Sequence, residues 1–147
     1  MRVVIQRSKK SSVTVDNKIV GKIDHGLVVL VGFTEGDTES DIDYIVNKIV
    51  NLRIFNDENN VMNKSLLDVN GQILSISQFT LYADTKKGRR PSYVNALKGE
   101  KAILLYELFN KKIKELGITI ETGIFGADME VSIKNDGPTT IVMESRG

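Results

Sequence analysis

The apolar run Leu27–Phe33, inside the segment GLVVLVGF, constrains the fold more than any other feature of the sequence. Both faces of a strand built from this run would be apolar, so it predicts a central buried strand rather than a half-solvated one. Shorter segments rich in Val and Ile precede it, and turn signals such as Asp16-Asn17 separate them. We therefore expect a strand over 26–33, and further strands over 2–7, 12–16 and 18–24.

Helical and strand patterns alternate along the next part of the chain. From Thr38 the apolar residues fall at helical spacing, which predicts a helix over about 38–52 that begins with a capping box. A polar loop over 56–64 and a hairpin turn at 69–72 then lead into a long strand over 72–82.

A second helix is predicted over about 92–116, because Pro91 suits the first turn of a helix and Gly117 suits its end. Its expected buried stripe comprises Leu97, Leu104, Leu105, Leu108, Ile113 and Leu116. The remaining patterns predict strands over 118–121 and 129–133, a turn over 135–138 and a last strand over 139–144.

This order of elements predicts a single α+β domain over 1–147. We expect largely antiparallel β-sheets, curled into a barrel-like core, with two flanking helices. The sequence shows no internal repeat, linker or low-complexity segment that would divide it.

Composition removes several classes of function. Lys and Arg number 20 against 19 Asp and Glu, so we expect no global field for DNA or a membrane surface, and contact with a polyanion should be local. The absence of cysteine excludes disulfides, thiolate nucleophiles and zinc–thiolate sites. The one histidine, His25, lies in a predicted turn, and no cofactor or metal is indicated. Without a signal peptide or a spanning apolar run, the default expectation is a soluble cytoplasmic protein.

Polar side chains interrupt the end of the long strand predicted over 72–82. Gln78 and Thr80 would project from the same face of an extended chain, on either side of Phe79. Two interpretations stay open. Thr favours strands and Gln faces water in any half-exposed strand, but strand ends that open into loops also tend to carry functional groups.

Two other segments carry the same ambiguity. A basic run consists of Lys86, Lys87, Arg89 and Arg90, and it is either a solvated loop or a phosphate contact beside the predicted start of the second helix. The stretch NDGPTT at 135–140 has strong turn chemistry, so an ordinary hairpin connection would account for it without any function.

Taken together, SQFTL at 77–81, KKGRRPS at 86–92, FGADMEV at 125–131 and NDGPTT at 135–140 resemble the D-aminoacyl-tRNA deacylases. The N-terminal MRVVIQR and the segment GLVVLVGF extend the resemblance over essentially the whole chain. It implies a homodimer that hydrolyses the ester between a D-amino acid, or glycine, and the terminal ribose of tRNA. Aminoacyl-tRNA, including glycyl-tRNA, is therefore the expected substrate.

The resemblance also implies roles for particular residues. The family motif SQ-x-x-L falls on Ser77, Gln78 and Leu81, and the motif N-x-G-P-x-T falls on Asn135, Gly137, Pro138 and Thr140. In such proteins the Gly-Pro bond is cis, and the dipeptide of one subunit enters the pocket of the other, where its carbonyls hold the substrate ammonium and its backbone blocks an L side chain. Further matches are Arg7, which supports the dipeptide, Phe125 and Met129, which line the adenosine pocket, and the basic run, a candidate acceptor-stem contact.

The expected chemistry needs no histidine or cysteine. An aminoacyl ester is already activated, and the neighbouring ribose 2′-hydroxyl can help to position water. Backbone N–H groups near Phe79 and Thr80 would then form an oxyanion hole, with Ser77 and Gln78 holding its geometry.

Three alternatives stay open. In the first, Thr80 acts as a nucleophile, provided that folding brings it a base. A non-catalytic tRNA-binding module would use Phe79, Tyr82 and Tyr93 as stacking surfaces. An interaction partner that has only kept the fold is the third.

Overall fold

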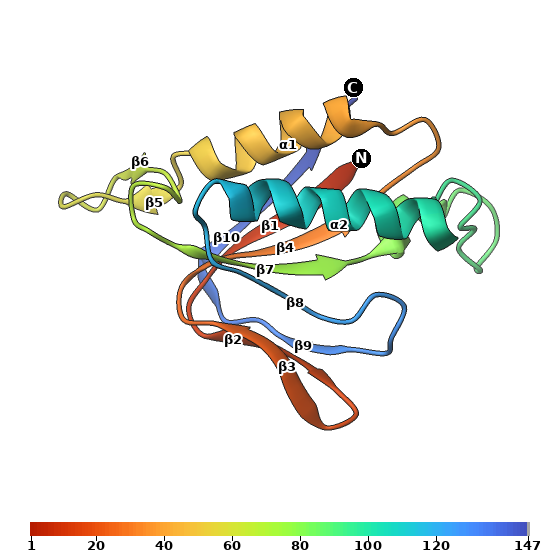
Figure 1. Ribbon diagram of the computed structural model, residues 1–147, viewed down its shortest axis with the longest axis horizontal. Coiled ribbons are helices and arrows are strands. Elements are labelled where there is room, and N and C mark those ends of the chain that lie inside the picture. Colours follow the sequence, from red (N-terminus) through yellow and green to blue (C-terminus); the bar gives the residue numbers. More distant parts are fainter. Residues whose placement is uncertain (147) are drawn as a thin grey trace.

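A computed structural model describes residues 1–146 of the chain. Five strands form the larger sheet, in the order β10-β1-β4-β7-β8. Their bounds are β1 Arg2–Ser8, β4 Gly26–Gly32, β7 Gln72–Ser77, β8 Ile120–Thr122 and β10 Asn135–Glu144. Both long helices, α1 (Glu39–Asn51) and α2 (Gly99–Glu115), lie along one face of this sheet (Figure 1).

A smaller sheet covers part of the opposite face. It has the order β3-β2-β9, with β2 at Ser11–Val15, β3 at Lys18–Ile23 and β9 at Glu130–Ser132. Val13 and Ile23 from this sheet pack against Val28 of β4 and against Leu74 and Ile76 of β7. A short hairpin of β5 (Phe55–Asn56) and β6 (Met62–Lys64) follows α1.

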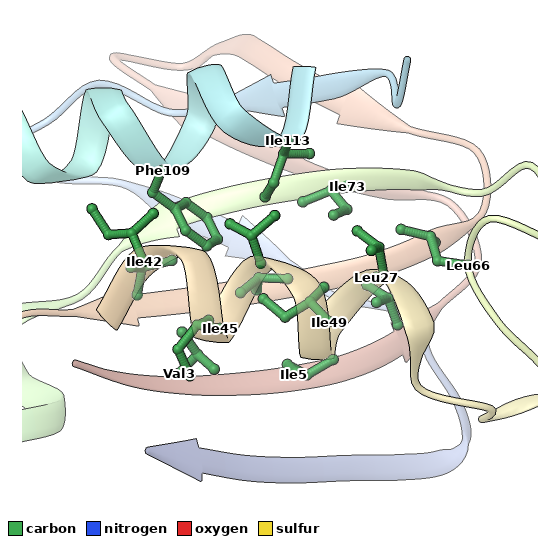
Figure 2. Packing of buried hydrophobic residues seen from close by; sticks show 14 of the residues in the cluster. Val3, Ile5, Leu27, Ile42, Ile45, Ile49, Leu66, Ile73, Phe109 and Ile113 are labelled. Atoms are coloured by element: carbon green, nitrogen blue, oxygen red, sulfur yellow. The ribbon is translucent and has the colours of Figure 1, made fainter. Parts of the chain in front are cut away.

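The main core lies between the helices and the larger sheet. Figure 2 shows how side chains of the two helices meet side chains of β1, β4 and β7, namely Ile42, Ile45, Ile49, Phe109 and Ile113 against Val3, Ile5, Leu27 and Ile73. All of these side chains are fully buried. Leu27, Val28 and Val29 are buried on alternating faces of β4, which confirms the prediction of a central strand.

The predicted α+β class and the largely antiparallel pairing are confirmed, since five of the seven strand pairs within residues 1–146 are antiparallel, but the barrel is wrong. Strand β4 is antiparallel to β1 and parallel to β7, and β7 is parallel to β8, so the larger sheet is mixed. The sheet stays open, with β10 and β8 at its edges. The turn expected to form a hairpin at 69–72 does not join neighbouring strands, because a parallel pair requires a long crossover, which here contains α1.

Three predicted boundaries are also wrong. Strand β7 ends at Ser77 and is followed by the 3-10 helix η1 (Phe79–Tyr82), so the strand does not reach residue 82. The second helix begins at Gly99 and not near 92, because Leu97 N–H donates to the Phe33 carbonyl (2.9 Å) and ties the preceding loop to the residue that follows β4. Residues 135–138 are extended at the start of β10 instead of forming a turn.

The buried stripe of α2 also differs from the prediction. Leu104 and Leu116 are exposed, whereas Ile113 is buried as predicted, and Leu97, Leu105 and Leu108 are partly buried against the core. The other buried side chains of the helix are Ala102, Tyr106 and Phe109. The prediction placed the stripe by apolar residue type, whereas the observed stripe includes a tyrosine that has a polar partner inside the protein. Over residues 1–146, no helix combines the length and the apolar character needed to cross a membrane.

Candidate active site

A cavity of about 390 Å³ opens where the carboxyl ends of β4 and β7 lie side by side. Four segments line it, comprising residues 31–33, 76–79, 97–99 and 125–129, together with Ala102 and Val131. The fold therefore brings Ser77, Gln78 and Phe79 into one cavity with Phe125 and Met129, although the two groups are far apart in sequence. Lys98, which sequence reasoning had not singled out, lines the same cavity.

Gln78 lines the cavity, and Thr80, which is not among the lining residues, lies next to Gln78 as the sequence predicted, although the backbone there is not extended. Gln78 N–H donates to the Val31 carbonyl (2.7 Å), which ties the end of β7 to β4. The Gln78 side-chain amide donates to the Thr80 hydroxyl (2.5 Å). Gln78 therefore fixes both the backbone and the hydroxyl of the segment that follows the strand.

The turn η1 leaves two backbone donors free of intrahelical partners. The first N–H groups of a helical turn have no acceptor within the turn, and these belong to Phe79 and Thr80, whereas Leu81 N–H already donates to the Gln78 carbonyl (3.3 Å). Among residues 1–146, the side chain hydrogen-bonded to the Thr80 hydroxyl is an amide, which cannot accept a proton as a general base. Among the described residues, the Thr80 hydroxyl therefore has no general base as its hydrogen-bond partner.

Tyr106 of α2 holds the end of β7 that leads into this segment. Its hydroxyl donates to the Ser75 carbonyl (2.7 Å) and accepts from the Ser75 hydroxyl (3.3 Å), and burial raises the pKa of Tyr106. Its ring lies 5.9 Å, centroid to centroid, from that of Phe125 on the cavity wall. Sequence reasoning missed Tyr106, and the one available signal was a tyrosine at a core position of an amphipathic helix.

The Gly-Pro motif lies at the other end of the larger sheet. Asn135 pairs with Ser8, and Ser8 pairs with Gly26, whereas Ser77 pairs with Val31 near the cavity. Gly26 and Gly32 mark the two ends of β4, and six residues of extended chain span about 20 Å. Figure 1 shows β7 running toward the loop that precedes α2, while β10 begins at the opposite end. Within one chain the dipeptide does not reach the cavity.

Arg7 anchors the segment that carries the dipeptide. Its side chain is buried, at 7% exposed, and its guanidinium donates to the Ile54 carbonyl (2.7 Å) and to the Asp136 carbonyl (3.0 Å). The Asp136 carboxylate lies 3.5 Å from the same guanidinium. Arg7 thus joins β1, the loop after α1 and the residue that precedes Gly137.

Side chains of the motif itself hold the rest of this segment. The Asn135 side chain accepts from Thr139 N–H (2.9 Å) and donates to the Thr140 hydroxyl (3.0 Å). The Gly137–Pro138 peptide bond is cis, and Gly137 has a φ of 135°. A Cβ at Gly137 would come within 2.6 Å of the Thr139 hydroxyl and 3.0 Å of the Arg7 guanidinium, so only glycine fits.

The four cations of the basic run are all exposed, on a loop that we call the basic loop and define as residues 85–91. Backbone hydrogen bonds between Asp84 and Ser92 (2.8 and 2.9 Å) close its base. The expectation that these charges adjoin the start of the second helix is wrong, because α2 begins only at Gly99. His25 lies at the opposite end of the sheet, in a cavity of about 260 Å³ that contains none of the motif residues.

Comparison with known proteins gives consistent matches over the whole chain. The family model for D-Tyr-tRNA(Tyr) deacylase matches residues 4–144. A D-aminoacyl-tRNA deacylase of Bacillus cytotoxicus is 60% identical over 146 residues, which cover 99% of this chain and 100% of the relative. A second one, from Bacillus cereus, is 59% identical over the same share of both chains.

Solved structures also match over nearly the whole chain. The c-Myc DNA Unwinding Element Binding Protein superposes with a TM-score of 0.94 and 38% identity, with 100% of both chains covered. A probable eukaryotic D-amino acid tRNA deacylase superposes with a TM-score of 0.84 over 97% of both chains, and at 18% identity this likeness concerns the fold alone.

Proposed function

The chain belongs to the D-Tyr-tRNA(Tyr) deacylase family and is a hydrolase that acts on D-aminoacyl-tRNA, and we propose that it selects its substrate with the Gly137–Pro138 backbone of a second copy. The reaction releases a free D-amino acid and tRNA. The observation that carries the proposal is that the dipeptide and the cavity lie at opposite ends of the larger sheet within one chain. A two-fold related copy can place its dipeptide at that cavity and receive the first copy's dipeptide in return.

A backbone filter suits an enzyme that must accept many D side chains and reject L ones. Such an enzyme has to recognise the α-carbon instead of a particular side chain. In this proposal the carbonyls of Gly137 and Pro138 accept hydrogen bonds from the substrate ammonium, and the same backbone excludes an L side chain by steric conflict. Glycine has no side chain to exclude, so glycyl-tRNA passes the filter. The contacts of Arg7 and Asn135 support the proposal, because a steric filter must be rigid.

The surface beside β10 supports a homodimer. β10 is an edge strand, and Val142 on it is 61% exposed. Val142 pairs with Val4, and Val4 pairs with Leu30, so three aliphatic side chains form a row on the face away from the helices. The smaller sheet packs against β4 and β7 and leaves this row only partly covered. An apolar row at an open sheet edge is suited to a second copy of the chain.

Catalysis in this proposal relies on orientation and polarisation. The N–H groups of Phe79 and Thr80 stabilise the oxyanion that forms when water attacks the ester carbonyl, and a single donor of this kind contributes roughly 10²–10³ in rate in other enzymes. The terminal ribose 2′-hydroxyl of the tRNA positions the water. Gln78 and Ser77 hold the donors in place, and Phe125 and Met129 line the space for the terminal adenosine.

The first test compares hydrolysis of D-tyrosyl-, L-tyrosyl- and glycyl-tRNA in one buffer. We expect rapid loss of the D and glycyl esters, with the L ester hydrolysed at its spontaneous rate. Binding of tRNA without hydrolysis of any ester would favour the non-catalytic alternative.

A mixing experiment tests whether the filter acts between subunits. Gly137→Val alters the dipeptide, Gln78→Ala alters the cavity, and each variant alone should be inactive. After the two are unfolded and refolded together, random pairing of subunits restores one complete site in each mixed dimer, or about a quarter of the wild-type sites. No recovery of activity, with mixed dimers present, would exclude a filter that acts between subunits.

Thr80→Ala separates the two catalytic mechanisms. The oxyanion-hole mechanism expects substantial residual turnover, because the backbone N–H remains. The nucleophile mechanism expects near-complete inactivity and an acyl-enzyme in the wild type. A substrate that ends in 2′-deoxyadenosine provides the second measurement, since an undiminished rate would remove the ribose hydroxyl from the mechanism.

A further inference from the structure

The side chain of Phe79 has no part in the proposed oxyanion hole, which uses only the backbone N–H of this residue. Its ring lines the cavity but is 44% exposed, a large fraction for a phenylalanine at the end of a core strand. Tyr93 meets it edge to face, with ring centroids 5.2 Å apart and planes at 73°. The two rings form a small aromatic surface that borders the cavity through Phe79.

A lysine completes this surface. The Lys98 ammonium lies 5.3 Å from the centroid of the Phe79 ring and 5.7 Å from that of Tyr93, within the range of a cation–π contact. Within residues 1–146, none of the ion pairs involves Lys98. Its charge is therefore held over aromatic rings at the cavity and is available to an anion.

The loop that carries Tyr93 and Lys98 is fixed at several points. Ser92 exchanges two backbone hydrogen bonds with Asp84, Ala96 N–H donates to the Tyr93 carbonyl (3.0 Å), and Leu97 N–H donates to the Phe33 carbonyl. The Thr34 hydroxyl donates to the Asn95 carbonyl (2.6 Å). The aromatic surface is thus held in place before any ligand arrives, which lowers the entropic cost of binding.

From these contacts we propose that Phe79, Tyr93 and Lys98 form a subsite for the nucleotide that precedes the terminal adenosine of the tRNA. The base of this nucleotide stacks on the exposed Phe79 ring, which Tyr93 supports by its edge-to-face contact, and Lys98 pairs with the phosphate. This inference rests on the proposed function, which places the aminoacyl ester beside the backbone of Phe79 and Thr80.

Two considerations favour this ligand. The aminoacylated end of tRNA is single-stranded, so its bases are free to stack on aromatic side chains, and such stacking tolerates any base. The chain that leaves the cavity must also pass from the ester toward the rest of an anionic RNA. Lys98 and the basic loop provide positive charge on this side, on the same segment between η1 and α2.

The experiment compares two small substrates, the 3′-D-tyrosyl ester of adenosine and the same ester of the dinucleotide cytidylyl-adenosine. For the wild type we expect kcat/KM to be roughly 5- to 160-fold higher for the dinucleotide, the range that one stacked base provides. In Tyr93→Leu and in Lys98→Gln, this ratio should fall toward one. Because the readout is a ratio, a general loss of activity on both esters cancels.

Two matched controls accompany these variants. Val94→Ala truncates an exposed aliphatic side chain next to Tyr93, and Lys111→Gln removes an exposed charge on α2, and both should keep the wild-type ratio. A wild-type ratio near one, or a wild-type ratio that both Tyr93→Leu and Lys98→Gln retain, would overturn the subsite while leaving the proposed function intact. Hydrolysis of neither D ester by the wild type would overturn the proposed function, and the subsite with it.

Discussion

Replacing Arg7 by methionine should destabilise the protein by about 2–4 kcal/mol without unfolding it. Methionine fills a similar volume but leaves the Ile54 and Asp136 carbonyls without their donor. A buried acceptor left unpaired costs about 1–3 kcal/mol, and the Asp136 carbonyl, which is only partly buried, contributes toward the lower end of that range. Domains of this size have a free energy of unfolding of about 5–15 kcal/mol, so most of the population stays folded.

Urea unfolding measures this loss. With a slope of about 2 kcal/mol per molar urea, the midpoint should fall by about 1–2 M with the slope unchanged. Arg53→Met is the matched control, because Arg53 is exposed and its contacts with Asn63 lie at the surface, so its free energy of unfolding should stay within about 0.5 kcal/mol of the wild type. If the two variants shift the midpoint equally, the reasoning about buried carbonyls is wrong.

The same variant separates stability from filtering. In the absence of urea, folded Arg7→Met should hydrolyse D-tyrosyl-tRNA more slowly than the wild type, because the residue before Gly137 is no longer fixed. A folded variant with wild-type rates on D and L esters would show that the filter does not depend on Arg7.

Further predictions concern two tyrosines and the basic loop. Tyr106→Phe removes the donor to the Ser75 carbonyl and should lower the free energy of unfolding by about 1 kcal/mol, whereas Tyr44→Phe, at an exposed position, should not change it in the same urea titration. Burial raises the pKa of Tyr82 to about 12, so the folded state holds the phenol proton more tightly than the unfolded chain does. The free energy of unfolding should therefore be constant below pH 10 and decline between pH 10 and 12. The decline should be less than about 1.4 kcal/mol per pH unit. Unfolding at pH 9 and 11.5 should show a smaller alkaline loss in Tyr82→Phe, and an equal loss would contradict this. Replacing the four cations of the basic loop by glutamine should weaken tRNA binding and reduce the slope of log Kd against log salt by up to roughly 0.9 for each phosphate contact removed, and an unchanged slope would place the tRNA elsewhere.

The sequence predicted best what depends on local pattern. The strand at 26–33 and the helix that follows Thr38 were found because burial on two faces, or on one stripe, is visible in the order of apolar residues. The capping box was confirmed in part by Thr38 N–H, which donates to the Asp41 carboxylate (2.9 Å).

Pairing between distant segments was not predictable in this way. The alternation of side chains in β7 does not indicate whether its neighbour runs parallel or antiparallel, so the mixed sheet was missed. Residues 92–98 have a helical pattern, but bonds from Leu97 to Phe33 and from Ser92 to Asp84 stabilise a loop instead. Both outcomes are cases in which tertiary contacts override local propensity.

For the site, resemblance supplied the motif residues and the structure supplied their arrangement. Gln78 and Thr80 were expected to be neighbours on an extended strand, and they are neighbours across a strand end. Tyr106 and Lys98 could not be found from the sequence, because their importance comes from what folding places beside them, a carbonyl in one case and two aromatic rings in the other.

The distance between the dipeptide and the cavity has a consequence for how strand lengths can change over evolution. Adding or removing two residues in both β1 and β4 preserves the alternation of core and surface side chains, so the altered chain would still fold. The same change moves the dipeptide by about 7 Å relative to the cavity. If the filter acts between subunits, the lengths of these strands set the distance between the dipeptide and the cavity in the dimer. Catalysis then constrains these lengths even where folding would tolerate a change.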